Sequence, residues 1–173
     1  MIKTMSTLSR PNHSSFPFFE KMTEPRLVAY TRFRGVLNAP SRIWMVRDWA
    51  KRTGCHLVGP PQCVFYPEGT DPEQQLCEVQ WAIAEAAVPD DGEVGLRWSG
   101  NRPVIATYHL GKPSTMHDTA LALETWGQAN GYRLTGASRE VYYFDLKAPS
   151  DNWITEIQLY VDGTHQEFRG GRR

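Results

Sequence analysis

One acidic residue, Glu140, stands in the middle of a segment that otherwise has the composition of a β-strand, GASREVYYFD (136–145). Aromatic neighbours lower the local dielectric, so a lone carboxylate among them is costly unless a cation or a hydrogen-bond donor joins it. A flat, positively charged aromatic group would meet both demands, by stacking on the rings and by pairing its charge. The simpler interpretation is a solvated strand glutamate that pairs at modest gain with Arg139 or Arg97.

Other residue types that often carry chemistry lack the spacing for it. Cys55, Cys63 and Cys77 are odd in number and have no CxxC spacing, which indicates reduced thiols rather than disulfides or a zinc site. The histidines stand at positions 13, 56, 109, 117 and 165, with no partner spacing for a Ser-His-Asp arrangement. We therefore expect no metal and no cofactor.

The charge balance argues against a polyanionic partner. The chain of 173 residues has 19 basic and 19 acidic side chains, and only the terminal RGGRR forms a small basic run. No charge excess favours nucleic acid or a membrane surface as partner. The first 25 residues are too polar and too interrupted by proline for a signal peptide, and no later apolar run has the length of a membrane span. A cytoplasmic protein is expected.

The elements that would position Glu140 occur twice. A shift of 77 residues places Trp49 on Trp126, Gly54 on Gly131, Gly59 on Gly136, Val64 on Val141, Phe65 on Tyr142 and Tyr66 on Tyr143. A shift of 78 places Glu78, Val79 and Gln80 on Glu156, Ile157 and Gln158. The sequence thus predicts one module written twice.

Each copy has the pattern strand, helix, strand, strand. In the first copy the elements are predicted for RLVAYTRF (26–33), residues 40–53, CVFYPE (63–68) and EVQWAIA (78–84). In the second they are predicted for PVIATYHL (103–110), residues 114–130, REVYYF (139–144) and ITEIQLYV (154–161). Gly54 and Gly131 would end the helices. Two such βαββ units pair most simply into an α+β fold, an antiparallel sheet with both helices on one face.

These elements set the expected domain organisation. We expect a loose leader over residues 1–25, a domain over 26–162 and a tail over 163–173. Within the domain the repeats span about 26–88 and 95–162, joined by the turn-rich VPDDGEVG (88–95). A helix-turn-helix would not fit beside the two modules, so a direct transcription factor is not expected.

Side-chain alternation divides each predicted strand between two faces. The phase that stays apolar or aromatic in both copies is predicted to face the helices; it holds Val64, Tyr66, Val141, Tyr143, Val79, Trp81, Ile83, Ile157, Leu159 and Val161. The copies diverge in the other phase, which holds Cys63, Phe65, Glu140, Tyr142, Gln80, Gln158 and Tyr160. Both copies of a duplicated fold need core residues, whereas the functional residues are needed in one copy only. Glu140, whose repeat equivalent is Cys63, is therefore the functional candidate, whereas Glu78 and Glu156 obey the repeat and are predicted to be structural.

Four features together resemble the gyrase-inhibitor-like (GyrI-like) small-molecule-binding domain, also found as the effector domain of many multidrug-responsive transcription activators. They are a strand that ends in glycine, a helix with a late Trp-x-x-x-x-Gly, GASREVYYFD, and NWITEIQLYVD (152–162). The resemblance covers about residues 26–162, and the tandem βαββ modules are of the SHS2 type. It implies a cleft between pseudo-symmetric halves, with aromatic walls and a carboxylate at its base. The family's pocket glutamate corresponds to Glu140.

The resemblance implies a protein that binds flat, hydrophobic and often cationic small molecules, a drug or toxin, for self-protection. Candidate walls of the cleft are Tyr142, Tyr30, Tyr108, Phe65, Trp98, Trp153 and Tyr160, each of which could equally be a packing residue. Trp49 and Trp126, which are symmetric and helical, are assigned to the core.

Three alternatives stay open. Some stand-alone relatives are hydrolases that open cyclopropane rings of DNA-alkylating natural products; Glu140 would then deprotonate a water, and Tyr108 or Tyr142 would hydrogen-bond the carbonyl that gains charge. The pocket could instead bind without turnover, in a sequestering protein or one that has gyrase as its protein partner. The haem-binding SOUL proteins share a similar duplicated fold, with His109 or His56 as axial ligand; otherwise His109 is expected to be a half-exposed strand residue.

Overall fold

The computed structural model describes residues 16–68, 71–84, 92–143 and 149–163. At its centre lies an eight-stranded sheet, in the order β1-β6-β8-β7-β3-β4-β2-β5, in which all neighbouring strands are antiparallel. The elements are β1 (Phe19–Met22), β2 (Arg26–Arg34), η1 (Val36–Asn38), α1 (Ala39–Thr53), β3 (Leu57–Phe65), β4 (Leu76–Ile83), β5 (Gly95–Ser99), β6 (Pro103–Leu110), η2 (Pro113–Thr115), α2 (Met116–Ala129), β7 (Leu134–Tyr143), η3 (Ser150–Asn152) and β8 (Ile154–Val161). The predicted α+β fold with duplicated βαββ units is confirmed.

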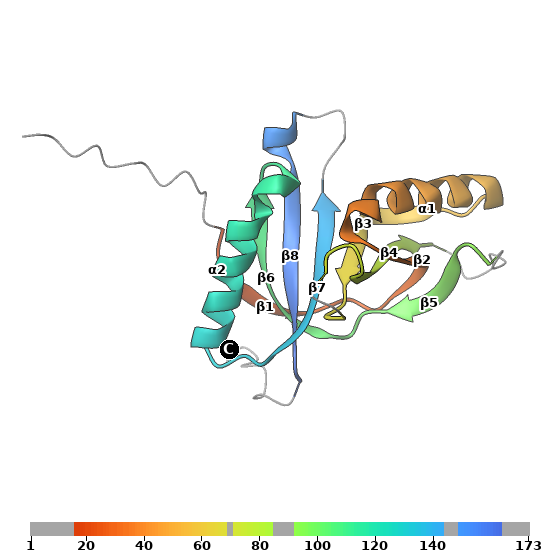
Figure 1. Ribbon diagram of the computed structural model, residues 1–173. Coiled ribbons are helices and arrows are strands. Elements are labelled where there is room, and N and C mark those ends of the chain that lie inside the picture. Colours follow the sequence, from red (N-terminus) through yellow and green to blue (C-terminus); the bar gives the residue numbers. More distant parts are fainter. Residues whose placement is uncertain (1–15, 69–70, 85–91, 144–148, 164–173) are drawn as a thin grey trace, which may run out of the picture.

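Both helices cover the same face of the sheet, one over each half (Figure 1). The core under α1 includes Trp49, and the core under α2 includes Leu123. Cys63, Glu140 and Ile157 lie directly opposite one another on β3, β7 and β8, so their side chains project from one face. Cys63 belongs to the core under α1 and Ile157 to the core under α2. The adjacent strands β3 and β7 therefore carry the seam between the two helices.

The helices begin and end close to the predicted residues. Helix α1 is followed by Gly54, whose left-handed φ of 72° ends the helix, and Gly131, with a φ of 81°, follows α2. Trp49 is fully buried, as predicted for a core residue. Trp126 is partly buried against the core under α2 and stacks on Tyr132, with 5.6 Å between the ring centroids.

The repeat is longer than the sequence patterns indicated. Strand β1 lies within the segment predicted to be a leader, and the shift of 77 places it on Leu96–Ser99 of β5, which was not predicted either. Strand β1 pairs with β6 and β5 pairs with β2, so each repeat adds its first strand to the edge of the other. The connections that follow these strands meet, because Asn101 N–H donates to Thr23 O (2.7 Å) and Thr23 N–H donates to Arg102 O (2.9 Å). This exchange ties the two halves together.

The predicted faces of β3 and β7 are wrong. Phe65 and Tyr142, like Cys63, pack against the core under α1, so the phase that contains Glu140 is the helix-facing one. Val64 instead packs with Val104, Tyr160 and Tyr66 on the opposite face, and Val141 and Tyr143 share that phase. Both phases of these central strands carry apolar side chains, so alternation could not distinguish the faces. The assignment of Val79, Ile83, Ile157 and Val161 to the helix face is confirmed.

Candidate functional site

Glu140 lies on β7 at the seam between the helices, half-buried on the helix-bearing face. Its strand neighbour on the same face, Tyr142, donates a hydrogen bond from its hydroxyl to Glu140 Oε2 at 2.7 Å. Phe65 lies diagonally across from Glu140 on β3, because Cys63 is the residue directly opposite. The seam thus combines a carboxylate with two aromatic side chains, Phe65 and Tyr142.

The charge of Glu140 is poorly compensated. Among the described residues, no lysine or arginine lies within ion-pair distance of its carboxylate. Arg97 pairs with Glu78, and Arg139 donates to Gln158, so neither takes the partner role that the sequence left open. Loss of hydration raises the pKa of Glu140, and the hydrogen bond from Tyr142 opposes that rise. A cation, or a proton, would relieve the cost of this carboxylate.

The groups beside Glu140 resist ionisation. Burial, followed by the charge of Glu140, raises the pKa of the Tyr142 phenol well above its usual value. Burial also raises the pKa of the Cys63 thiol, with further contributions from Cys77 and Glu140. Tyr142 therefore stays a hydrogen-bond donor, and Cys63 stays a neutral thiol rather than a nucleophilic thiolate.

Three of the predicted aromatic walls lie on the opposite face of the sheet. Tyr108 is directly opposite Glu156 and packs with Phe16 and Phe19. Tyr160 packs with Val64 and Val104. Tyr30 lies near two guanidinium groups, those of Arg32 and Arg97, at 5.7 and 5.1 Å from its ring centroid. The structure does not bring Tyr30, Tyr108 or Tyr160 together with Glu140.

The two predicted tryptophans are also not adjacent to Glu140 in the sheet. Trp98 is 71% exposed on the edge strand β5, four strands from β7, or about 19 Å at the usual strand spacing. Trp153 is partly buried just before β8, and its carbonyl accepts a hydrogen bond from Gly111 N–H (2.8 Å). Of the predicted wall residues, Phe65 and Tyr142 are the ones whose strand positions place them beside Glu140.

Two polar residues, one of which the sequence patterns did not indicate, continue the row of Tyr142 across the sheet. Thr155 lies opposite Tyr142 and is fully buried, and its hydroxyl has no hydrogen-bond partner among the described residues. His109, next in the row, is 5% exposed rather than half-exposed, and its ring nitrogens bond the hydroxyls of Thr119 (2.9 Å) and Thr115 (3.0 Å). Both nitrogens are thus engaged, which disfavours His109 as an axial haem ligand. The repeat could not indicate this row, because the register of the strands was unknown.

The two glutamates that obey the repeat form ion pairs on the opposite face. Glu78 is fully buried and pairs with Arg32 and Arg97, with Nε of Arg32 at 2.9 Å. Glu156 is also fully buried and pairs with Lys21. A tyrosine hydroxyl bonds each carboxylate: Tyr66 on Glu78 at 3.5 Å and Tyr143 on Glu156 at 3.1 Å. These contacts agree with the structural role predicted for both residues.

Comparison with known proteins identifies the fold. No family model matches the sequence, and no curated protein is significantly similar to it. The C-terminal domain of EcmrR has a similar structure, with a TM-score of 0.76 and 19% identity over 85% of this chain and 98% of that one. A hydrolase from Listeria innocua has a TM-score of 0.64 and 13% identity over 86% of this chain and 93% of its own. SAV2435 bound to tetraphenylphosphonium has a TM-score of 0.53 and 11% identity over 85% of this chain and 94% of its own. These structures fit the GyrI-like fold.

The described residues contain neither a metal-binding cluster nor a helix suited to span a membrane. No group of three or more His, Cys, Asp and Glu side chains is arranged to hold a metal ion in this part of the chain. Neither helix of the described segments is long and apolar enough to cross a membrane.

Proposed function

We propose that the protein binds hydrophobic organic cations at the seam between its two helices, with Glu140 as the anionic anchor. The proposal rests on the state of the Glu140 carboxylate, which is half-buried at the seam with Phe65 and Tyr142. Among the described residues, this carboxylate accepts a hydrogen bond from the Tyr142 hydroxyl and is paired with no cation. A lipophilic cation would supply the missing charge and bury apolar surface at the same time. The fold of SAV2435, which binds such a cation, supports the proposal.

Phe65 and Tyr142 suit a flat or aromatic ligand. Tyr142 bonds the carboxylate and Phe65 lies diagonally across from it on β3. Both side chains are packed against the core under α1, so little side-chain entropy remains to be lost on binding. Binding of this kind would serve to sequester a toxic compound, and protection of the cell is the role that we assign to it.

The test is a calorimetric titration with tetraphenylphosphonium. Glu140→Gln keeps the shape of the side chain and removes its charge, so we expect a loss of about 1 to 3 kcal/mol in binding free energy. Glu124→Gln, the same change on the exposed face of α2, should bind like the wild type. Equal affinity of wild type and Glu140→Gln would sink the assignment of the site.

A second candidate function is hydrolysis of a cyclopropane-bearing alkylator at the same carboxylate. The raised pKa of Glu140 favours it, since a more basic carboxylate is a better acceptor for a proton from water. The water oxygen would bond the ring carbon, and the broken C–C bond would leave its electron pair on the conjugated carbonyl. Tyr142 would hold the carboxylate in position. Tyr108, the other tyrosine considered, projects from the opposite face and is removed from this scheme.

Turnover separates the two functions. The purified protein would be incubated with such an alkylator and the drug followed by chromatography, beside Glu140→Gln. A hydrated product formed catalytically by the wild type alone would establish the hydrolase. Unchanged drug, together with tight binding of tetraphenylphosphonium, would establish the binding protein.

A further inference from the structure

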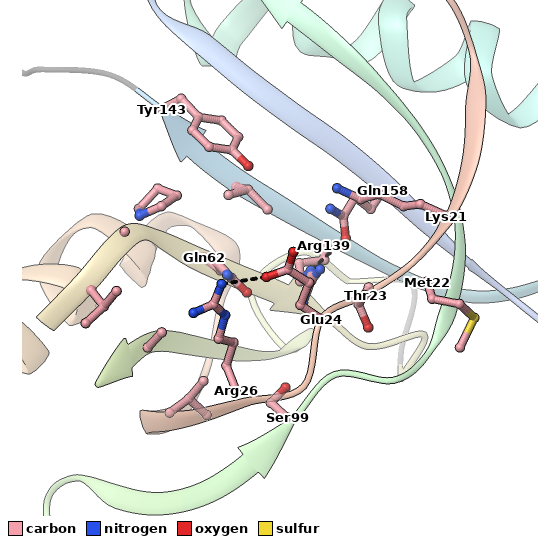
Figure 2. Close-up of a pocket in the computed structure, with 16 residues that line it drawn as sticks. Lys21, Met22, Thr23, Glu24, Arg26, Gln62, Ser99, Arg139, Tyr143 and Gln158 are labelled. Atoms are coloured by element: carbon pink, nitrogen blue, oxygen red, sulfur yellow. Dashed lines mark hydrogen bonds and ion pairs between the residues drawn. The ribbon is translucent and has the colours of Figure 1, made fainter. Parts of the chain in front are cut away.

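A cavity of about 280 Å³ lies on the face of the sheet opposite the helices (Figure 2). It is open to solvent on one side and is lined by the segment that joins β1 to β2, by residues 58–60 of β3 and by side chains of β7 and β8. Its polar lining includes Lys21, Glu24, Arg26, Gln62, Arg139 and Gln158. The volume is near the lower limit of small-molecule sites, which suits a ligand the size of a small metabolite.

Arg139 is the unusual residue of this cavity. It is only 6% exposed, and its Nε donates a hydrogen bond to Gln158 Oε1 at 2.7 Å. The amide of Gln158 is fixed in this orientation, because its Nε2 donates to Glu156 Oε1 at 2.7 Å. No carboxylate of the described residues lies within ion-pair distance of Arg139. A buried guanidinium thus keeps its terminal NH₂ groups without an anionic partner, which is costly for a charged group.

The other charges around the cavity are already compensated. Lys21 pairs with the buried Glu156. Arg26 pairs with Glu24 at 2.5 Å, and both side chains are mostly in solvent, 54% and 75% exposed. One positive charge, that of Arg139, therefore remains deep in the cavity, and Figure 2 shows it beside Gln158 with Gln62, Arg26 and Glu24 around the same space.

The repeat indicates that the charge of Arg139 has a functional role. The shift of 77 places Gln62 on Arg139, and both residues line the cavity. In the first half, Gln62 makes a neutral pair with Gln80, whose Nε2 donates to Gln62 Oε1 at 3.2 Å. In the second half, a cation occupies the equivalent position, so packing at this position does not require a charge. The Gln62 amide nitrogen, which has no partner among the described residues, is a second donor beside the guanidinium.

We propose that this cavity binds a small molecule through a carboxylate or phosphate group, with Arg139 as the primary contact and the amide of Gln62 as a second donor. A guanidinium fork matches both oxyanions, since its parallel N–H groups can bond two oxygen atoms at once. Arg26 would reach the anion after releasing Glu24. This site is separate from the seam at Glu140, on the other face of the sheet, and neither proposal depends on the other.

The test is a titration of ¹⁵N-labelled protein with inorganic phosphate and, separately, with succinate, each against sodium chloride at equal ionic strength. We expect saturable shifts of the side-chain amide signals of Gln62 and Gln158 with at least one probe. Phosphate alone would identify a phosphate ligand and succinate alone a carboxylate. If neither probe shifts these signals beyond the chloride reference, the proposal is overturned.

Three variants sharpen the test. Arg139→Gln, which copies the first half, should lower the affinity about tenfold or more, as expected for hydrogen bonds to a charged group. Glu24→Gln removes the competing carboxylate from an exposed position and should raise the affinity for the anion about two- to fivefold. Arg34→Gln, an exposed arginine outside the cavity lining, should leave it unchanged. If a folded Arg139→Gln variant binds the anion as tightly as the wild type, the site is contradicted. The same holds if Glu24→Gln does not bind the anion more tightly than the wild type. Should Arg139→Gln fail to fold, the comparison with Glu24→Gln decides.

Discussion

Glu78 and Glu140 are both acids of the central strands, yet they lie on opposite faces of the sheet and differ in how their charge is compensated. Glu78 is fully buried, pairs with Arg32 and Arg97, and has its repeat equivalent, Glu156, in a similar ion-pair cluster. Among the described residues, Glu140 has one hydrogen-bond donor, Tyr142, and it replaces a cysteine of the first half. The two glutamates that obey the repeat, Glu78 and Glu156, are thus paired inside the fold. Glu140 and Arg139, which break the repeat at neighbouring positions of β7, have no ion-pair partner among the described residues.

The largest effect is expected from Glu78→Gln. The change leaves two arginine side chains beside a fully buried neutral amide, so the free energy of unfolding should fall by about 3 kcal/mol. Glu140→Gln, which removes an uncompensated charge, should cost nothing. Urea unfolding of both variants measures the free energy of unfolding. If both variants lose the same amount, Glu78 and Glu140 do not differ in how their charges are compensated.

Arg139→Gln should stabilise the fold by about 1 kcal/mol in a buffer without oxyanions, because it removes an uncompensated buried charge. Addition of phosphate or succinate, whichever binds, should then stabilise the wild type more than the variant at the same anion concentration. Thermal unfolding with and without the anion measures both effects. A variant that is less stable than the wild type in the anion-free buffer would mean that Arg139 is structural.

The pH dependence of stability should report on Glu140. Its pKa in the folded protein is raised above the ordinary value of 4.5, so the wild type is relatively more stable below that pH and loses this advantage as the pH rises through the folded-state pKa. Relative to Glu140→Gln, the wild type should therefore lose stability from about pH 4.5 upward. Affinity for an organic cation should change in the opposite sense and rise with the ionised fraction of Glu140. Parallel pH profiles of the two proteins would contradict the shift.

An effect as small as that of Arg139→Gln is expected from Tyr142→Phe. The hydroxyl of Tyr142 lowers the pKa of Glu140, so its loss should raise that pKa further and move the rise of cation affinity to higher pH. At neutral pH the loss in binding free energy should be about 1 kcal/mol. Tyr143→Phe, which loses a comparable hydrogen bond to Glu156 on the other face, is the matched control and should bind the cation like the wild type.

Much of the fold could be predicted because a repeat gives each pattern two chances to be recognised. Both helices and the strand-helix-strand-strand order were found in this way. Strands β1 and β5 were missed because they are short edge strands, of four and five residues, without clear alternation. Their pairing with the far half is a long-range contact that no local pattern encodes.

The candidate site could be addressed from the sequence only in part. Glu140 was singled out as the functional candidate because it breaks the repeat, and that comparison needs no knowledge of structure. Its face was wrong because Cys63 and Val64, neighbours on β3, are both buried, one on each side of the sheet. The same comparison of repeats, applied one residue earlier, singles out Arg139 against Gln62.

The exchanged edge strands set an order for folding during synthesis. The first repeat leaves the ribosome before β5, which completes its edge, and β1 has no partner until Pro103–Leu110 has been made. Neither repeat can finish its half of the sheet alone, so the chain should gain its full stability in one late step after most of it has been translated. The duplication that doubled the fold has, through this exchange, left it a single cooperative unit.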